Sequence, residues 1–213
     1  MQFHRPPLAA RPMHQVSIAG LLAMILTGCG VAPGLPHPAP APALPSVPTA
    51  WTLNAAHPCA SEVPGVINFG FVSADVWRGT KPTTQGMRSL AAMGVKTIID
   101  LQEDDETAEL PAGIQYVRLT VSGWQADQVD VKQVLAAIAD APKPVFIHCQ
   151  MDRDRTGLAI AAYRLWQGMN EPEAIEELRN FHVNLWWEGP IINRINALKR
   201  QGLIPVKSSE TVR

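Results

Sequence analysis

The sequence predicts an α/β fold: a central, mostly parallel sheet flanked by helices, in a single domain with a helical C-terminal part. Short apolar segments rich in β-branched residues alternate with segments of helical period, as in βαβ units. The strand segments are apolar without alternation, which is typical of strands buried on both faces. After the strand segment that ends at Cys149, only helical patterns follow. A sheet covered by helices on both faces satisfies these patterns.

The predicted elements alternate along the chain. Strands are expected at residues 66–72, 76–79, 95–101, 114–121 and 145–147. Helices are expected from Thr83 or Thr84 to Met93, from Asp127 to the prolines at 142 and 144, after Gly157, from Asn170 through Leu178, and after Pro190. Gly94 and Gly168 are placed to end the helices before them, because glycine adopts the left-handed conformation without steric cost.

The chain is organised around residues 145–157, Val-Phe-Ile-His-Cys-Gln-Met-Asp-Arg-Asp-Arg-Thr-Gly. A strand, a short loop and a helix start follow one another here, so backbone N–H groups and the positive end of the helix dipole converge on one point. Such a point binds an anion such as phosphate, and its field favours a thiolate over a thiol. Cys149 is placed to attack the bound group as a nucleophile. Arg155 offers a planar fork for two phosphate oxygens.

The motif at residues 148–157, His-Cys-(five residues)-Arg-Thr-Gly, resembles the signature loop of Cys-dependent protein tyrosine phosphatases of the compact dual-specificity type. The passage at residues 77–82, Trp-Arg-Gly-Thr-Lys-Pro, resembles one near the start of the same domains. The resemblance covers about residues 64–200. It implies that Cys149 forms a phosphocysteine that water then hydrolyses, and that Arg155 binds the phosphate and stabilises its transition state. It also implies that no metal or other cofactor is needed.

The remaining loop residues are expected to bind substrate: Gln150, Met151, Asp152, Arg153, Thr156 and Gly157. Asp152 departs from the resemblance, because the family usually has glycine at this sharp turn. Aspartate tolerates left-handed geometry better than most residues, yet its carboxylate is expected near a dianionic phosphate, with Arg153 offsetting it. This departure leaves open a catalytically weak pseudophosphatase that binds phosphorylated ligands.

Two neighbours of the nucleophile have supporting roles in this interpretation. The Thr156 hydroxyl is placed either to donate a hydrogen bond to the Cys149 sulfur or to be satisfied within the first turn of the helix. His148 is expected to orient the loop through backbone contacts, and not to act directly as a base.

The motif does not fix the general acid. In relatives an aspartate normally lies in the loop after the preceding strand, here near residues 122–124, Ser-Gly-Trp, which contain no carboxylate. Asp127 is the nearest one downstream, although it is equally well placed to cap a helix. Asp154 lies in an Asp-Arg-Thr setting that resembles myotubularins and some bacterial phosphatases, in which a loop aspartate is the acid. We expect Asp154 to be the acid, with Asp127 as the second candidate.

The substrate class stays open among phosphotyrosine, phosphoserine or phosphothreonine, and phosphorylated inositols or lipids. The chain has 18 Lys+Arg against 19 Asp+Glu, which gives no sign of the basic face that nucleic-acid binding needs. The acidic run at residues 103–106 is expected to be a solvated loop and not a metal site. Sulfurtransferases of the rhodanese type also use a cysteine loop, but they lack the five-residue spacing between Cys149 and Arg155.

Residues 1–28 resemble a lipoprotein signal peptide. Arg5 and Arg11 precede an apolar run that is too short to span a membrane, and the run ends in Leu-Thr-Gly before Cys29. This order resembles a bacterial lipoprotein box, in which the cysteine is lipidated and becomes the first mature residue; the alternative is a plain secretory peptide. Gly30 favours the outer membrane in enteric-type sorting. We therefore expect an exported, periplasm-facing protein with a lipid anchor in the membrane.

Residues 29–60 form a linker rich in proline and alanine, which favours an extended conformation and separates the domain from a membrane. The phosphatase domain is assigned to residues 61–203 and a tail to residues 204–213. Cys59 lies just before the domain. It is expected to be a free thiol, and a redox bridge to Cys149 is the alternative in an oxidising compartment.

Overall fold

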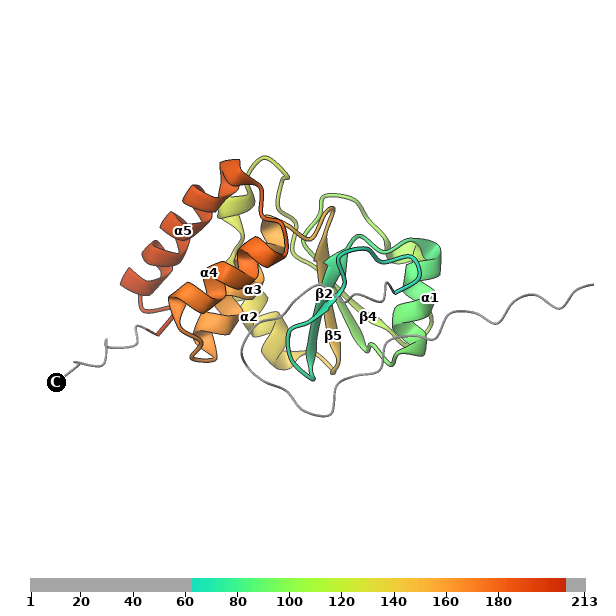
Figure 1. The fold of residues 1–213 in the computed structure, drawn as a ribbon. Helices are drawn as coiled ribbons and strands as arrows, with labels where there is room; N and C mark the ends of the chain where they lie inside the picture. Colours follow the sequence, from blue (N-terminus) through green and yellow to red (C-terminus); the bar gives the residue numbers. More distant parts are fainter. Residues whose placement is uncertain (1–62, 206–213) are drawn as a thin grey trace, which may run out of the picture. The chain divides into compact units, whose positions relative to one another are not determined.

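The computed structural model describes residues 63–205, so the expectations for the signal peptide, Cys29, the linker, Cys59 and most of the tail lie outside the described residues. A five-stranded sheet forms the centre of the described part (Figure 1). Its strands are β1 (Gly70–Phe71), β2 (Val76–Thr80), β3 (Thr97–Asp100), β4 (Gln115–Arg118) and β5 (Val145–Cys149). The helices are α1 (Thr84–Ala92), α2 (Val131–Asp140), α3 (Arg155–Trp166), α4 (Glu171–Asn180) and α5 (Leu185–Arg200), with short 3-10 helices η1 (Thr107–Glu109) and η2 (Ala126–Gln128).

The strands follow the order β1-β2-β5-β3-β4 across the sheet. Only the pair of β1 and β2 is antiparallel, so the predicted mostly parallel sheet is confirmed. β5 lies between β2 and β3, with Cys149 level with Thr80 and His148 level with Asp100. The candidate nucleophile therefore lies at the carboxyl end of the central strand, which is where open α/β sheets bind ligands.

Helices cover both faces of the sheet (Figure 1). Helix α1 packs on one face, where Ile98 and Phe146 point into a cluster with Trp77 and Met87. Helices α2, α3, α4 and α5 contribute to a larger cluster that contains Ile99 and the other strand residues of opposite orientation. Successive strand residues point to opposite faces, and the residues of β2, β3 and β5 are buried throughout, as predicted for a sheet covered on both faces. The edge strand β4 differs, because Gln115 and Arg118 at its ends are exposed.

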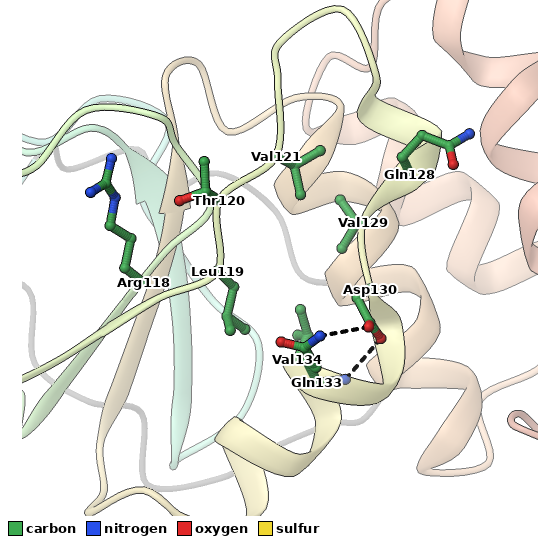
Figure 2. Close-up of a pocket in the computed structure, with 9 residues that line it drawn as sticks. All are labelled: Arg118, Leu119, Thr120, Val121, Gln128, Val129, Asp130, Gln133 and Val134. Atoms are coloured by element: carbon green, nitrogen blue, oxygen red, sulfur yellow. Dashed lines mark hydrogen bonds between the residues drawn. The ribbon is translucent and has the colours of Figure 1, made fainter.

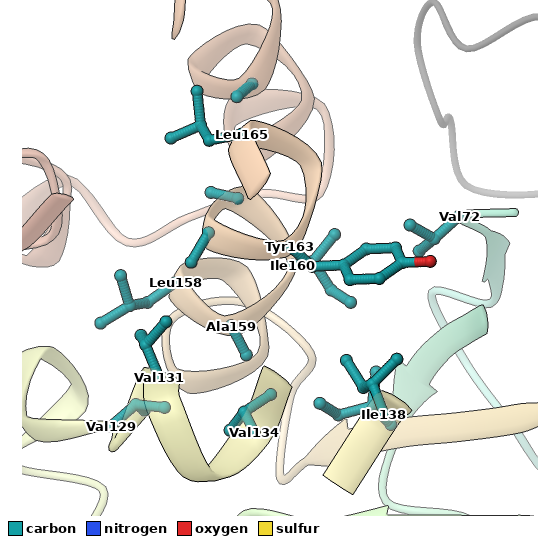
Figure 3. Close-up of a cluster of buried hydrophobic side chains, with 14 of the residues drawn as sticks. Val72, Val129, Val131, Val134, Ile138, Leu158, Ala159, Ile160, Tyr163 and Leu165 are labelled. Atoms are coloured by element: carbon teal, nitrogen blue, oxygen red, sulfur yellow. The ribbon is translucent and has the colours of Figure 1, made fainter. Parts of the chain in front are cut away.

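Helix α3 holds the larger cluster together. Its residues 155–165 are all buried, and Figure 3 shows its apolar side chains beside Val131 and Val134 of α2. Gly157 lets α3 approach α4 closely: a Cβ atom at this position would lie 2.5 Å from Leu178 Cδ1. The helix that follows the signature loop is therefore fixed by the core of the domain.

The predicted start of the second long helix was wrong. α2 begins at Val131, and its N-cap is Asp130, whose Oδ1 accepts a hydrogen bond from the Gln133 N–H at 3.1 Å (Figure 2). Asp127 lies earlier, in η2, and Val129 between them belongs to neither helix. Asp127 is therefore not a cap of this helix. The caps predicted at Thr83 and Asn170 are present, each accepting a hydrogen bond from the third residue that follows.

The last helix also begins earlier than predicted. α5 starts at Leu185, with Asn184 Oδ1 accepting a hydrogen bond from the Trp186 N–H at 3.0 Å. Pro190 lies inside this helix. The sequence prediction began the helix after the proline and did not consider Asn184 as its cap. Within residues 63–205, the helices all fall short of the length and apolar character that crossing a bilayer demands.

Candidate active site

Cys149 is the last residue of β5 and is buried, with 3% of its surface exposed. Five residues separate it from Arg155, the first residue of α3. The predicted arrangement of strand, loop and helix is therefore present in residues 145–157. The start of α3 brings backbone N–H groups that are unpaired within the helix to the loop beside the thiol.

Arg155 connects the signature loop to the ends of two other strands. Its Nη1 donates hydrogen bonds to the carbonyl oxygens of Val121, at 2.7 Å, and Leu101, at 3.2 Å. A pocket opens beside the guanidinium, lined by Gln102, Glu103, Asp104, Gly123, Trp124, Gln150 and Arg155. A second pocket, between residues 118 and 134, is not lined by Arg155 or by any other residue of the signature loop (Figure 2). Cys149 lines neither pocket, but Gln150 beside it in sequence lines the first. The chemistry therefore favours the first pocket as the substrate site.

Asp152 is oriented differently from the sequence prediction. We expected its carboxylate beside the phosphate, but it is fully buried and accepts hydrogen bonds from Arg78 Nε at 3.1 Å and Asn68 Nδ2 at 2.9 Å. Arg78 Nη2 also donates to the Asp152 carbonyl oxygen at 2.8 Å. Burial raises the pKa of Asp152 to about 7, and the Arg78 guanidinium opposes that rise. The backbone φ of 57° is the left-handed turn for which the family usually has glycine.

The contact between Arg78 and Asp152 belongs to a larger buried network, which we call the brace: Arg78, Asp152, Arg164 and Glu177. Arg78 Nη1 lies 3.9 Å from Glu177 Oε1, and Arg164 Nε donates to Glu177 Oε2 at 2.7 Å. All four side chains are at most 3% exposed, and their formal charges cancel. The guanidinium of Arg78 also lies over the Phe181 ring, 3.8 Å from its centroid. The brace joins β2, the signature loop, α3 and α4.

On the other side of the nucleophile, the His148 imidazole is completely buried between two carboxylates. Its Nδ1 lies 3.8 Å from Asp100 Oδ1, and its Nε2 lies 3.7 Å from Glu106 Oε2. Both distances exceed a hydrogen bond, and neither ring nitrogen has a hydrogen-bond partner among residues 63–205. Burial lowers the pKa of His148 to about 4, so the imidazole is neutral near pH 7. The His148 carbonyl oxygen accepts a hydrogen bond from the Leu101 N–H, the kind of backbone contact predicted for it.

Asp100, Glu106 and His148 are also the described residues whose ligand atoms are close enough to hold a metal ion, all within 4.8 Å of one another. Lys81 Nζ lies 3.2 Å from Glu106 Oε1, and the Tyr116 hydroxyl donates to Asp100 Oδ2 at 2.6 Å. An ammonium group thus already supplies positive charge to this cluster. Glu106 is buried, which corrects the prediction that residues 103–106 are all solvated. Its burial and the Asp100 charge raise the pKa of its carboxyl group.

The two candidate acids differ in position. Asp154 precedes Arg155 in the loop, and its Oδ1 accepts a hydrogen bond from the Asn184 N–H at 2.9 Å. Burial raises the pKa of Asp154, which keeps a carboxyl protonated closer to neutral pH, as a general acid requires. Asp127 lies in η2, outside the loop. Neither carboxyl lines the pocket beside Arg155.

The other predicted loop residues divide into exposed and buried ones. Gln150, Met151 and Arg153 are exposed, whereas Thr156 and Gly157 are buried in the first turn of α3. The Thr156 hydroxyl has no hydrogen-bond partner among the described residues, so neither the predicted bond to the Cys149 sulfur nor the alternative bond within the first turn of the helix is formed.

A family profile described as "DSP-PTPase phosphatase fused to NAD+ kinase" matches residues 71–185, more than half of the chain. The chain belongs to this phosphatase family. The matched segment contains the signature loop and the sheet that holds it, so the family is recognised over the part that forms the candidate site.

The phosphatase domain is also similar to individual relatives. The dual specificity protein phosphatase TpbA of Pseudomonas aeruginosa (strain UCBPP-PA14) is 33% identical over 126 residues, which are 56% of this chain and 57% of TpbA. The alignment thus spans less than two thirds of that relative. A crystal structure of P. aeruginosa TpbA has a TM-score of 0.57 and 28% identity, covering 70% of this chain and 92% of that one. The structure of a Cys-to-Ser variant of TpbA in complex with pTyr has a TM-score of 0.56 and 27% identity, with the same coverage.

Sequence reasoning about the phosphatase loop missed four residues around it. Arg78 and Asn68 hold Asp152 from β2 and the segment before β1. The Trp-Arg-Gly passage signalled Arg78, but nothing in its spacing pairs it with the loop. Glu103 and Asp104 line the pocket beside Arg155, and the acidic run that contains them was interpreted as solvent-exposed loop alone.

Proposed function

We propose that the domain hydrolyses phosphomonoesters of protein side chains through a phosphocysteine on Cys149. The observation that carries this proposal is the position of Cys149 and Arg155 at the two ends of one loop, between the central strand and a buried helix of a phosphatase-family domain. A thiolate at the first position attacks the phosphorus, and a guanidinium at the second binds the equatorial oxygens.

The reaction follows from these roles in two steps. The Cys149 thiolate forms the S–P bond as the P–O bond to the leaving group breaks, and Asp154 gives its proton to the departing oxygen. Water then attacks the phosphocysteine, the S–P bond breaks to return the thiolate, and Asp154 takes up the proton of the water. Arg155 stabilises the phosphoryl oxygens in both transition states.

The pocket supports a protein substrate over a polyphosphorylated inositol. Glu103 and Asp104 line it next to Arg155, and their carboxylates repel additional phosphate groups on a ligand. The exposed ring of Trp124 lines the same pocket and offers an apolar surface to a phosphotyrosine ring. The complex of the TpbA variant with pTyr supports phosphotyrosine as the first substrate to test.

The chain is further proposed to be an exported lipoprotein. Cleavage after residue 28 leaves Cys29 as a lipidated first residue, and residues 29–60 tether the phosphatase domain to the membrane that holds the lipid, on its periplasmic side. The support is the Leu-Thr-Gly-Cys order after a short apolar run with basic residues before it. Replacement of Cys29 by serine is expected to abolish labelling with radioactive palmitate. Labelling that persists in this variant contradicts the anchor.

Turnover of p-nitrophenyl phosphate by the purified domain tests the enzymatic proposal. Wild type is expected to release p-nitrophenol, and Cys149→Ser to release none while keeping its fold by circular dichroism and its affinity for phosphate. Full turnover by Cys149→Ser contradicts the covalent mechanism. Phosphate-ester binding without turnover by wild type points to the pseudophosphatase alternative.

A further inference from the structure

Five of the six exposed large apolar side chains in residues 63–205 lie in the segments around the signature loop. We call them the apolar rim: Ile67, Trp124, Met151, Leu185 and Trp186. Their exposed fractions run from 50% for Met151 to 88% for Trp124. The sixth, Trp166, is at the opposite end of α3 from the loop. Exposed apolar groups in the segments that surround a site indicate an interaction surface.

Two rim residues lie in segments that reach the loop from the β2 side and the β4 side. Asn68 follows Ile67 in sequence, and its Nδ2 donates to the Asp152 carboxylate at 2.9 Å. Trp124 lines the pocket together with Arg155. Ile67 and Trp124 are therefore carried by different segments that both adjoin the loop.

The start of α5 supplies two more rim residues. Asn184 donates its N–H to Asp154 Oδ1 at 2.9 Å, which attaches the start of this helix to the loop. Leu185 and Trp186 follow directly, at 85% and 86% exposure. Met151 belongs to the loop itself. Apolar groups thus flank the site on the β2 side, the β4 side and the α5 side.

The charges at the pocket favour one class of partner for this surface. Glu103 and Asp104 form one wall of the pocket. Lys81 Nζ lies 3.3 Å from Asp104 Oδ2, and this single ammonium group does not balance two carboxylates, so the wall is net negative. A negative wall repels an anionic membrane surface and attracts a basic side chain. An extended polypeptide advances about 3.3 Å per residue, so a few residues on each side of a phosphorylated one reach groups on opposite sides of the loop.

We propose that the apolar rim binds the polypeptide on either side of the phosphorylated residue, selecting apolar side chains there and a basic side chain near the wall of Glu103 and Asp104. This rests on the proposed phosphatase function and adds the sequence preference of its substrate. The phosphate is held by the loop, while the rim supplies affinity that a small phosphoester does not use.

Matched phosphotyrosine peptides test the preference. One peptide has leucines on both sides of phosphotyrosine and one lysine, a second has serines in place of the leucines, and a third has glutamate in place of the lysine. We expect kcat/KM to be about tenfold higher for the first peptide than for either of the others. Equal kcat/KM for the three peptides overturns the proposal.

Three variants locate the effect. Trp186→Ser and Leu185→Ser are expected to remove most of the preference for the leucine peptide, with kcat/KM for p-nitrophenyl phosphate within about twofold of wild type because neither residue lines the pocket beside Arg155. Trp166→Ser is the matched control and keeps the preference. A preference unchanged in Trp186→Ser and Leu185→Ser, or lost equally in Trp166→Ser, contradicts the assignment.

Two further measurements test whether the rim binds a membrane and whether the proposed phosphatase function itself fails. Sedimentation with vesicles of phosphatidylethanolamine and phosphatidylglycerol is expected to leave the domain, residues 61–213, in the supernatant. Binding to vesicles that Trp186→Ser abolishes assigns the rim to a membrane and overturns the peptide proposal. If wild type fails to turn over p-nitrophenyl phosphate, the proposed function fails; the affinity of Cys149→Ser for the three peptides then still decides whether the rim selects sequence.

Discussion

Two buried clusters of charged groups flank the signature loop, and they are built on opposite principles. In the brace of Arg78, Asp152, Arg164 and Glu177, two cations meet two carboxylates, and short hydrogen bonds join Arg78 to Asp152 and Arg164 to Glu177. In the His148 cluster, both imidazole nitrogens face carboxylates at 3.7–3.8 Å without hydrogen bonds. The brace is balanced within itself, whereas the His148 cluster depends on Lys81, whose side chain is 29% exposed.

This difference indicates that the two clusters hold their sides of the signature loop with different strength. A balanced, hydrogen-bonded network fixes geometry, because separating any member leaves an unpaired buried charge. The brace therefore explains how Asp152 occupies a left-handed turn without facing the phosphate. Both clusters keep an unpaired buried carboxylate oxygen, Glu177 Oε1 in the brace and Glu106 Oε2 in the His148 cluster, but only the His148 cluster leaves its central group, the imidazole, without a hydrogen bond among the described residues.

The largest effect on catalysis is expected from replacing Arg155, which belongs to neither cluster. Arg155→Lys removes the planar fork and is expected to lower kcat/KM for p-nitrophenyl phosphate on the order of 10³-fold or more. Lys199→Ala, on the outer helix α5, is the control and is not expected to change the rate. Comparable losses in the two variants would indicate a nonspecific charge effect.

Substrates with different leaving groups distinguish the candidate general acids. Asp154→Asn is expected to slow hydrolysis of phosphoserine by about 10²-fold or more, with a much smaller loss for p-nitrophenyl phosphate, whose leaving group needs little protonation. It is also expected to remove the fall in rate at high pH, which reports loss of the acid's proton. Asp127→Asn and Asp104→Asn are the comparisons. If either of them shows the dependence instead, the acid is that residue.

Removing one cation from each cluster tests the contrast in stability. Arg78→Met leaves Asp152 and Glu177 short of one buried cation and is expected to cost about 3–5 kcal/mol of unfolding free energy. Lys81→Met is expected to cost much less, because the Lys81 side chain is partly solvated. Urea denaturation measures both. A greater loss in Lys81→Met contradicts the stronger contribution to stability assigned to the brace.

The two clusters are expected to respond to pH with opposite sign. The pKa of Asp152 is raised to about 7, so its stabilising contribution is present at low pH and is lost as pH rises from about 4 to 7. The pKa of His148 is lowered to about 4, so stability is lost as pH falls from about 6.5 to 4. Each slope is at most roughly 1.4 kcal/mol per pH unit.

Denaturation across this pH range checks the two signs. Asp152→Asn should remove the loss at rising pH, and His148→Gln should remove the loss at falling pH. A wild-type pH profile that neither substitution alters would show that these groups do not titrate between the folded and unfolded states as their environments indicate.

The fold was predictable because its signals are local. Apolar runs located the strands, although the run at residues 66–72 forms only the two-residue β1, and Thr83 and Asn170 located helix starts through their side chains. The start of α5 was not predicted, since Pro190 suggested a later start and the cap at Asn184 was not recognised. The motif from Cys149 to Arg155 was recognisable because the nucleophile and the phosphate-binding cation must lie on one short loop.

The surroundings of the loop depend on contacts between distant residues. Asp152 and Arg78 lie 74 residues apart, and Asn184 reaches Asp154 across 30 residues. No spacing rule joins such pairs, so the Asp152 carboxylate was expected to face the phosphate until its partners were known. The acidic run at residues 103–106 gave no sign that Glu106 alone turns inward toward His148.

The most direct test of covalent catalysis is to trap the intermediate. The domain is mixed with p-nitrophenyl phosphate, quenched in acid, digested and examined by mass spectrometry. We expect one phosphoryl group on the peptide that contains Cys149 in wild type, and none in Cys149→Ser. A phosphorylated residue other than Cys149, or turnover by wild type with no phosphorylated peptide at any quench time, would contradict the account.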